Sequence, residues 1–76
     1  MNTYKTTTPN GTTITKNSKR VYTHAVACKT DGSDWYVSGF CGSLELATKA
    51  VDAQYNYLVR NKNTGVEVQI LEVVGA

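Results

Sequence analysis

The sequence predicts an α+β fold, an antiparallel sheet of four to five strands with one helix packed on one face, in the order ββββαβ. Two turn signals and one helical stripe carry this prediction. An Asn-Gly and an Asp-Gly dipeptide each separate strand-prone segments, as in β-hairpins. The stretch after Gly42 instead repeats its apolar residues at helical spacing. A single helix on an antiparallel sheet is the simplest way to bury both apolar surfaces.

The first expected hairpin turns at Asn10-Gly11, because both residues tolerate the positive φ that a type I′ turn requires. Its arms, residues 4–8 and 12–16, are rich in threonine and therefore strand-prone. Ile14 is their one strongly apolar side chain. We therefore expect residues 1–18 to form a weakly packed hairpin, at an edge of a single domain that spans residues 1–76.

The second expected hairpin joins residues 20–29 to residues 35–40 through a two-residue Asp31-Gly32 turn. This turn places Thr30 opposite Ser33, and a regular ladder then places Cys28 opposite Trp35. Side chains alternate between the two faces of a strand. The face expected to meet the helix holds Tyr22, His24, Val26, Cys28, Trp35 and Val37. The other face holds Val21, Thr23, Ala25, Ala27, Tyr36, Ser38 and Phe40.

A helix is expected to begin after Ser43, a natural N-cap, with Glu45 in its first turn. Its expected buried stripe consists of Leu44, Ala47, Val51, Tyr55 and Leu58. The helix ends near Arg60, where residues 61–65 supply a break. Residues 66–74 form the last strand, whose alternation slips at Leu71 and indicates a bulge or a fully buried end.

The net charge of +2 is unevenly distributed along the 76 residues. The first 30 residues hold five basic side chains and no acidic one, whereas the remainder holds three basic and six acidic side chains. Such an asymmetric field steers association with an oppositely charged partner. A chain this short has little interior to spare for a catalytic pocket. We therefore expect a binding protein without a cofactor, and not an enzyme.

The location of the protein is predicted from two features. No apolar run approaches the ~18 residues of a membrane helix, and the N-terminal residues lack the apolar core of a signal peptide. We therefore expect a soluble, cytoplasmic protein. Cys28 and Cys41 lie roughly 20 Å apart in the expected ladder, beyond the ~7 Å between Cα atoms that a disulfide allows. Two free thiols fit a reducing compartment.

Cys41 and His24 are the candidates for the enzymatic alternative, a nucleophile with its base. Cys41 precedes a helix N-terminus, which lowers the pKa of a thiol, but no acid or amide is clearly placed to orient His24. Two cysteines and one histidine are one ligand short of a structural zinc site. We therefore expect a packed thiol and no metal site.

The candidate partner-binding residues are basic side chains near one turn and aromatic side chains on the second sheet face: Lys16, Lys19, Arg20, Tyr36 and Phe40. Together they would bind a larger protein, since tyrosine and arginine are frequent anchors at interfaces. The alternative is a small nucleic-acid-binding protein using Lys5, Lys16, Lys19, Arg20 and Tyr22, with base stacking on the tyrosine. If the helix leaves the second face bare, that face is a partner surface or a homodimer interface; otherwise the first hairpin folds back over it.

Part of the chain resembles small proteins of bacteriophages and mobile elements. The resemblance covers about residues 10 to 50 and is carried by residues 20–25, Trp35, residues 40–42, and Leu44 with Ala47. In size and element order the chain is similar to phage inhibitors of bacterial defence complexes, including anti-CRISPR proteins. The resemblance implies stoichiometric binding to a larger host complex in the host cytoplasm, and it assigns no catalytic residue.

Overall fold

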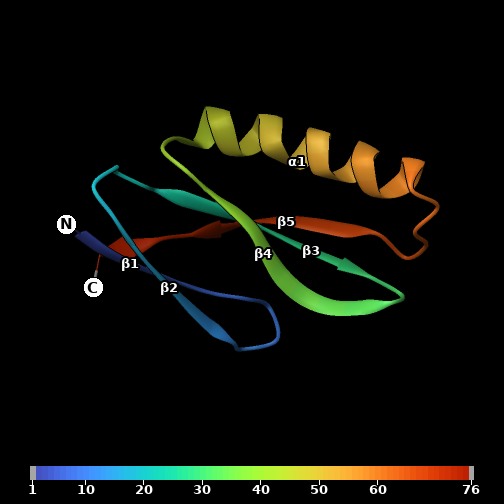
Figure 1. Cartoon of the computed structure of the whole chain (residues 1–76), viewed down its shortest axis with the longest axis horizontal. Coiled ribbons are helices and arrows are strands. Elements are labelled where there is room, and N and C mark those ends of the chain that lie inside the picture. Colours follow the sequence, from blue (N-terminus) through green and yellow to red (C-terminus); the bar gives the residue numbers. More distant parts are fainter. Residues whose placement is uncertain (1, 76) are drawn as a thin grey trace.

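A computed structural model describes residues 2–75 of the chain and has six strands and one helix (Figure 1). The elements are β1 (Asn2–Thr7), β2 (Thr13–Ser18), β3 (His24–Thr30), β4 (Ser33–Cys41), α1 (Leu44–Arg60), β5 (Glu67–Glu72) and β6 (Val74–Gly75). The α+β class with one helix is confirmed. The prediction of one sheet of four to five strands is wrong, because the strands form two antiparallel three-stranded sheets, β2-β1-β6 and β4-β3-β5.

The division into two sheets occurs at Val73. Before this residue, β5 pairs with β3; after it, β6 pairs with β1. The Val73 N–H donates a hydrogen bond of 3.2 Å to the carbonyl of Thr23, outside both ladders. The last residues therefore pass from one sheet to the other, and sequence periodicity alone does not reveal such a change of partner.

The elements form three layers, with α1 on one face of the β4-β3-β5 sheet and the β1–β2 hairpin on the other (Figure 1). The core under α1 is built from Val26, Cys28, Ala47 and Leu58, all buried. The core on the hairpin side is built from Ala25, Ala27 and Leu71. β3 contributes to both cores, which explains why its four central residues are all buried. The last strand therefore has the buried end that the sequence predicts: Leu71 packs in the core on the hairpin side, and Ile70 packs against the core under α1.

The β1–β2 hairpin closes through a different turn from the one predicted. The Gly11 N–H bonds to the carbonyl of Thr8, and the Thr8 N–H bonds to the carbonyl of Thr12. Gly11 has a φ of 89°, whereas Asn10 is not among the residues with positive φ. The type I′ prediction is therefore wrong. Pro9 is the first residue of the three-residue loop 9–11 and the second of the turn 8–11, where its fixed φ suits a type I turn followed by a left-handed glycine.

The hairpin buries side chains on one face despite its threonine-rich sequence. Tyr4, Thr6 and Thr8 are all buried. The Thr6 hydroxyl donates to the carbonyl of Glu72 at 2.8 Å, and the Thr8 hydroxyl accepts from the Thr12 N–H. Polar hydroxyls can be buried in this layer because each has a hydrogen-bond partner.

The β3–β4 hairpin departs from the predicted regular ladder at two places. Thr30 does face Ser33, but Cys28 faces Tyr36 and not Trp35, because the register shifts between Cys28 and Thr30. A second shift lies between Val26 and Ala27. Each shift adds one residue to β4 and exchanges the two faces of the strand.

The exchange of faces overturns part of the predicted distribution of side chains. Trp35 and Val37 pack in the hairpin-side core and not under the helix. Tyr36 lies on the helix side, opposite Cys28. The second shift restores the original alternation, so Phe40 lies on the hairpin side as predicted.

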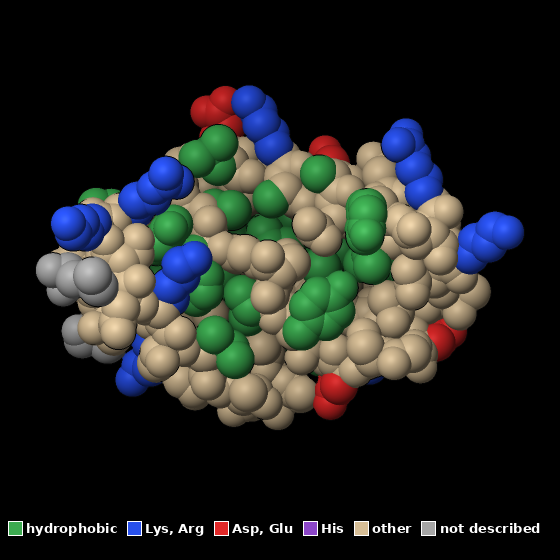
Figure 2. Space-filling model, viewed as in Figure 1, with side chains coloured by type: hydrophobic (Ala, Val, Ile, Leu, Met, Phe, Trp, Pro, Cys, Tyr) green, Lys and Arg blue, Asp and Glu red, His purple; other side chains and the backbone are tan. Residues whose placement is uncertain are grey.

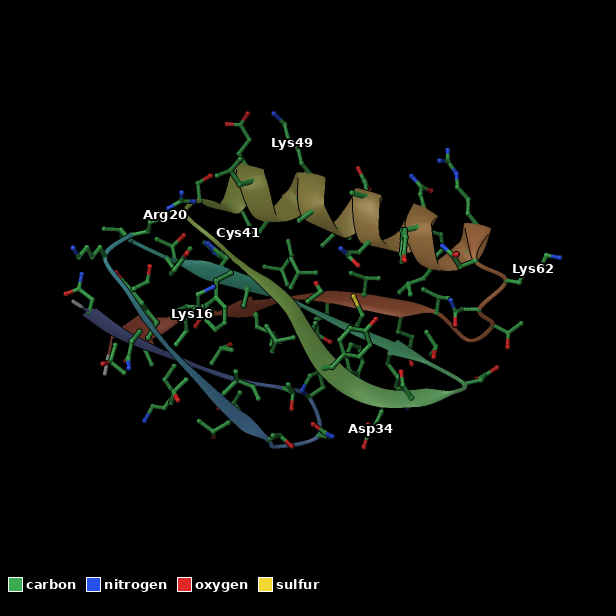
Figure 3. All side chains as sticks on the ribbon, viewed as in Figure 1. Lys16, Arg20, Asp34, Cys41, Lys49 and Lys62 are labelled. Carbon is green, nitrogen blue, oxygen red and sulfur yellow. The ribbon has the colours of Figure 1, made fainter. Side chains whose placement is uncertain are left out.

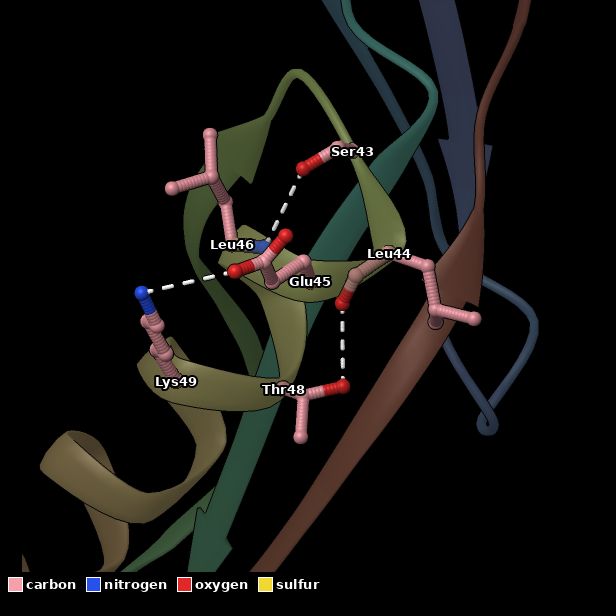
Figure 4. Close-up of polar contacts among 6 residues, drawn as sticks. All are labelled: Ser43, Leu44, Glu45, Leu46, Thr48 and Lys49. Atoms are coloured by element: carbon pink, nitrogen blue, oxygen red, sulfur yellow. Dashed lines mark hydrogen bonds and ion pairs between the residues drawn. The ribbon is translucent and has the colours of Figure 1, made fainter.

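The helix begins and ends where the sequence predicts. The Leu46 N–H donates to the Ser43 hydroxyl at 3.2 Å, and Lys49 lies 3.6 Å from Glu45 in an exposed i, i+4 pair (Figure 4). Ala47 and Leu58 are buried and Val51 is half-buried, but Leu44 and Tyr55 are about half exposed. The predicted stripe is therefore too wide, because the sheet below α1 has only three strands. Among the described residues, no helix combines the length and apolar character needed to cross a membrane.

Candidate functional site

Three predicted residues and one neighbour meet where the β1–β2 hairpin reaches the end of β4. The Lys16 Nζ lies 5.3 Å from the ring centroid of Tyr22 and 5.5 Å from that of Phe40. The Tyr22 ring in turn lies 5.6 Å from Phe40 and packs edge-on against Tyr4 at 5.4 Å. These are cation–π and aromatic contact distances. Lys16 is therefore oriented by two aromatic rings on other elements.

Local structure explains this cluster. Lys16 lies directly opposite Tyr4 in the β1–β2 ladder, so both side chains project from the same face of the hairpin. That face covers the hairpin side of the β4-β3-β5 sheet, where the second bulge places Phe40. Because Lys16 lies against the Tyr22 ring, a base that stacked on this tyrosine would have to displace it. The arrangement favours the nucleic-acid alternative less than the sequence does.

The other predicted basic residues lie around the start of α1 or on the opposite face of the hairpin. Arg20 follows β2, and its N–H donates to the Ser18 hydroxyl. A Cβ on Gly42 would lie 3.2 Å from the carbonyl of Val21, so this loop packs closely against the residues before α1. Figure 3 shows Arg20 and Lys16 at the same end of β4. Lys19 is exposed in this loop, whereas Lys5 alternates with buried Tyr4 and therefore points away from the cluster.

Tyr36 is separated from Phe40 by the sheet. It is 39% exposed on the helix side, above Cys28 and near Tyr57 of α1. Burial raises the pKa of the Tyr36 hydroxyl, with a further contribution from Cys28. The predicted joint patch of Tyr36 and Phe40 on one bare face is wrong, because the first bulge turns Tyr36 to the other face and the hairpin covers part of the face around Phe40.

Two residues that the sequence analysis did not select complete the surface around Tyr36. Leu46 and Tyr57 lie on the flank of α1 that faces β4 and are 53% and 62% exposed. Figure 2 shows hydrophobic side chains gathered on this face of the molecule, with Lys and Arg side chains toward both ends; Lys16 and Arg20 lie at the left end in the same view of Figure 3. We call Tyr36, Leu46 and Tyr57, with Lys16 and Arg20 at that end, the β4-side surface. In the sequence, Leu46 and Tyr57 could have been recognised as large apolar residues of the helix that lie outside its buried stripe.

The opposite end of β4 carries the acidic residue Asp34. Asp34 is fully exposed, and its pKa is lowered mainly by the Trp35 N–H, which donates to Oδ1 at 2.7 Å, with contributions from Asn10 and Lys29. Figure 3 shows Asp34 far along β4 from Lys16 and Arg20. The β4-side surface therefore has Lys16 and Arg20 at one end of β4 and the carboxylate of Asp34 toward the other.

The residues of the enzymatic alternative stand in one row across the sheet. The ladders place His24 opposite Cys41 on one side and opposite Glu72 on the other, so an acid missed by the sequence analysis neighbours the histidine. Within residues 2–75, however, no side-chain hydrogen bond links the His24 ring to either residue; its Nδ1 lies 2.7 Å from the Thr23 hydroxyl. Burial raises the pKa of the Cys41 thiol, which disfavours the nucleophilic thiolate.

Cys28 and Cys41 are both free thiols, as predicted. Among the described residues, no three His, Cys, Asp or Glu side chains gather closely enough to hold a metal ion.

Comparisons with protein-family models, with curated proteins and with solved structures found no match to this chain.

Proposed function

We propose that this chain is a non-enzymatic protein-binding module that binds a larger protein through the β4-side surface. The observation that carries the proposal is the exposure of Tyr36, Leu46 and Tyr57. Beside them lie two cations, Lys16, which contacts the Tyr22 ring, and Arg20, which lies in the loop after β2. Aromatic and arginine side chains are enriched among the residues that dominate interface energies. An exposed apolar surface with a charged border is typical of protein interaction sites.

The partner that fits this surface has apolar side chains next to acidic ones. Its acidic part would meet Lys16 and Arg20, and its apolar part would cover Tyr57 and Leu46. The resemblance to phage inhibitors adds a narrower proposal, that the partner is a host defence complex which the chain blocks by stoichiometric binding. Binding through a surface requires neither a reactive thiol nor a bound cofactor.

The proposal is tested with the tagged chain in a pull-down from a bacterial lysate, in which captured proteins are quantified against a variant. Tyr57→Ser removes the most exposed aromatic side chain of the surface and should reduce the captured partner about tenfold, since a desolvated tyrosine is a typical hot spot. Asn56→Ser, at an exposed position of α1, is the control and should leave capture unchanged. Capture that is equal with both variants would contradict the proposal.

The nucleic-acid alternative is separated by its dependence on salt. A mixed DNA and RNA pool retained at low salt and released steeply as salt rises would indicate contacts with phosphates. If the double variant Lys19→Glu and Arg20→Glu loses retention of the pool and Tyr57→Ser does not, nucleic-acid binding is favoured over protein binding as the function.

A further inference from the structure

The outer edge of β5 is an unpaired and regular strand edge. β5 pairs with β3 through an unbroken register from His24 opposite Glu72 to Lys29 opposite Glu67. Within residues 2–75, no strand pairs with its other edge. Such an edge presents free N–H and C=O groups, which pair readily with an added strand.

A groove of about 420 Å³ lies along this edge, between β5 and β1. Its lining consists of Lys5, Thr6, Thr7, Gln69, Ile70, Leu71, Glu72 and Val74. In the described part of the chain, β6 pairs only with Tyr4 and Lys5, so β1 also has a free edge here. Beyond those pairs, the Thr6 hydroxyl bonds to the carbonyl of Glu72 of β5. The groove thus opens between two strand edges, and its volume lies within the ~300–1,000 Å³ of typical ligand sites.

One flank of α1 extends over the same edge. The helix lies mainly over β3 and β5, and Leu44, Tyr55 and Val59 share the flank directed away from β4. These three residues are 56%, 49% and 48% exposed. Figure 4 shows Leu44 and Leu46 pointing to opposite sides of the helix, with Leu44 toward β5. A strand added to β5 would lie beneath this flank and cover it.

We infer that the β5 groove binds an extended peptide segment of a partner protein, which adds to the free edge of β5 as a further strand under Leu44, Tyr55 and Val59. This surface is separate from the β4-side surface, so the inference does not depend on the proposed function. Lys5 and Glu72 are the charged residues of the lining, and their formal charges cancel. An uncharged segment with alternating apolar side chains therefore complements the groove.

The exposed area distinguishes a peptide from a second copy of the chain. The three flank residues and Val74 are each about half exposed. If the tyrosine offers about half of its ~200 Å² and each smaller aliphatic side chain offers less, the four together offer roughly 300 Å². A stable protein–protein interface needs about 800 Å² on each partner. A short strand, held largely by main-chain hydrogen bonds, matches this area better than a dimer does.

The test uses a fluorescein-labelled seven-residue peptide of alternating threonine and valine, titrated against the full chain by fluorescence anisotropy. Main-chain hydrogen bonds supply much of the affinity in strand addition, so the probe need not be the natural sequence. We expect a Kd below ~1 mM. Tyr55→Ser should weaken binding about tenfold, since it removes apolar surface that the strand covers. Amide NMR signals of Gln69 and Leu71 should shift on binding.

Tyr57→Ser is the matched control, because it removes the same side chain from the opposite flank of the same helix, and it should leave the Kd unchanged. The same peptide N-methylated at alternate residues lacks the main-chain donors and should not bind. If Tyr55→Ser fails to fold by circular dichroism, Val59→Ser replaces it.

Four results would each overturn the inference: no binding up to 1 mM, equal binding of the N-methylated peptide, equal weakening by Tyr55→Ser and Tyr57→Ser, or self-association of the chain through β5 in place of peptide binding. Because the proposed function is read from Tyr57 and this inference from Tyr55, either one can fail while the other holds.

Discussion

β4 and β5 flank the same central strand, β3, but they pair with it in different ways. β4 shifts its register twice, whereas β5 keeps one register throughout. Bulges bend a strand and disturb its outer row of hydrogen-bonding groups, so they protect an edge from further strand addition. β4 is therefore an edge that offers side chains, and β5 is an edge that offers its backbone. One small sheet thus provides two surfaces with different modes of binding.

The largest expected effect concerns how firmly each edge is anchored to the hairpin-side core. Leu71 of β5 is 6% exposed, whereas Val37 of β4 is half-buried in the same cluster. Leu71→Ala should reduce the free energy of unfolding by about 3 kcal/mol and Val37→Ala by about 1 kcal/mol. Urea denaturation measures both. Equal losses would show that the two edges are anchored alike.

A smaller effect is expected where the turn between β3 and β4 is hydrogen-bonded to the loop before β5. The Asp31 N–H bonds to the carbonyl of Thr64, and the Thr64 hydroxyl bonds to the Asp31 carboxylate. Gly65 follows with a φ of 62°, and an added Cβ would collide with that carboxylate. Gly65→Ala should therefore cost about 2 kcal/mol.

Lys62 provides the control for this loop, since it has a φ of 63° without being glycine. Lys62→Gly relieves the left-handed conformation of a side-chain-bearing residue and should be neutral or stabilise the fold by up to ~1 kcal/mol. Thermal unfolding of the two variants should move in opposite directions, and a parallel shift would refute the argument from backbone conformation.

Removing a bulge would make β4 resemble β5. Ser38 is the additional residue at the second register shift, and its hydroxyl donates to the carbonyl of Val26 at 3.2 Å. Deleting Ser38 keeps Val37 opposite Ala27 and regularises the edge, at a cost of about 1 kcal/mol for the lost hydrogen bond. We expect concentration-dependent self-association in analytical ultracentrifugation. Ser38→Ala keeps the bulge and should remain at the original oligomeric state; association of both variants would show that the bulge does not protect the edge.

The smallest effect concerns a single ionisation at the end of β4. Burial disfavours the charged thiolate of Cys41 and raises its pKa above the ordinary 9.0. Stability from the neutral thiol is therefore complete below about pH 9 and is lost as the pH rises through the folded-state pKa. Alkylation by iodoacetamide, followed by mass spectrometry, should have its midpoint above pH 9.0, with Cys41→Ala as the blank. A midpoint near neutrality would instead support a nucleophile assisted by His24.

The sequence predicts those features of this protein that depend on neighbours along the chain. Ser43 caps α1, Glu45 pairs with Lys49, and Thr30 faces Ser33 across the Asp31-Gly32 turn. Each of these depends on residues within one turn of helix or one tight turn of strand. The candidate site was predicted least well, because Lys16 and Phe40 meet only after the hairpin folds over the sheet, and Leu46 and Tyr57 are exposed only because the sheet below α1 is narrow.

Local residue chemistry thus determined the α+β class, the helix and its cap, the positions of the turns and the basic first third of the chain. The tertiary structure decided which strands pair, which face Tyr36 occupies and which flanks of α1 are exposed. The physical reason is that one additional residue in a ladder, or a change of partner at Val73, has a small local cost but redirects every side chain beyond it. Contacts between residues distant in sequence decide whether the free energy gained elsewhere offsets that local cost. Only the folded chain contains these contacts.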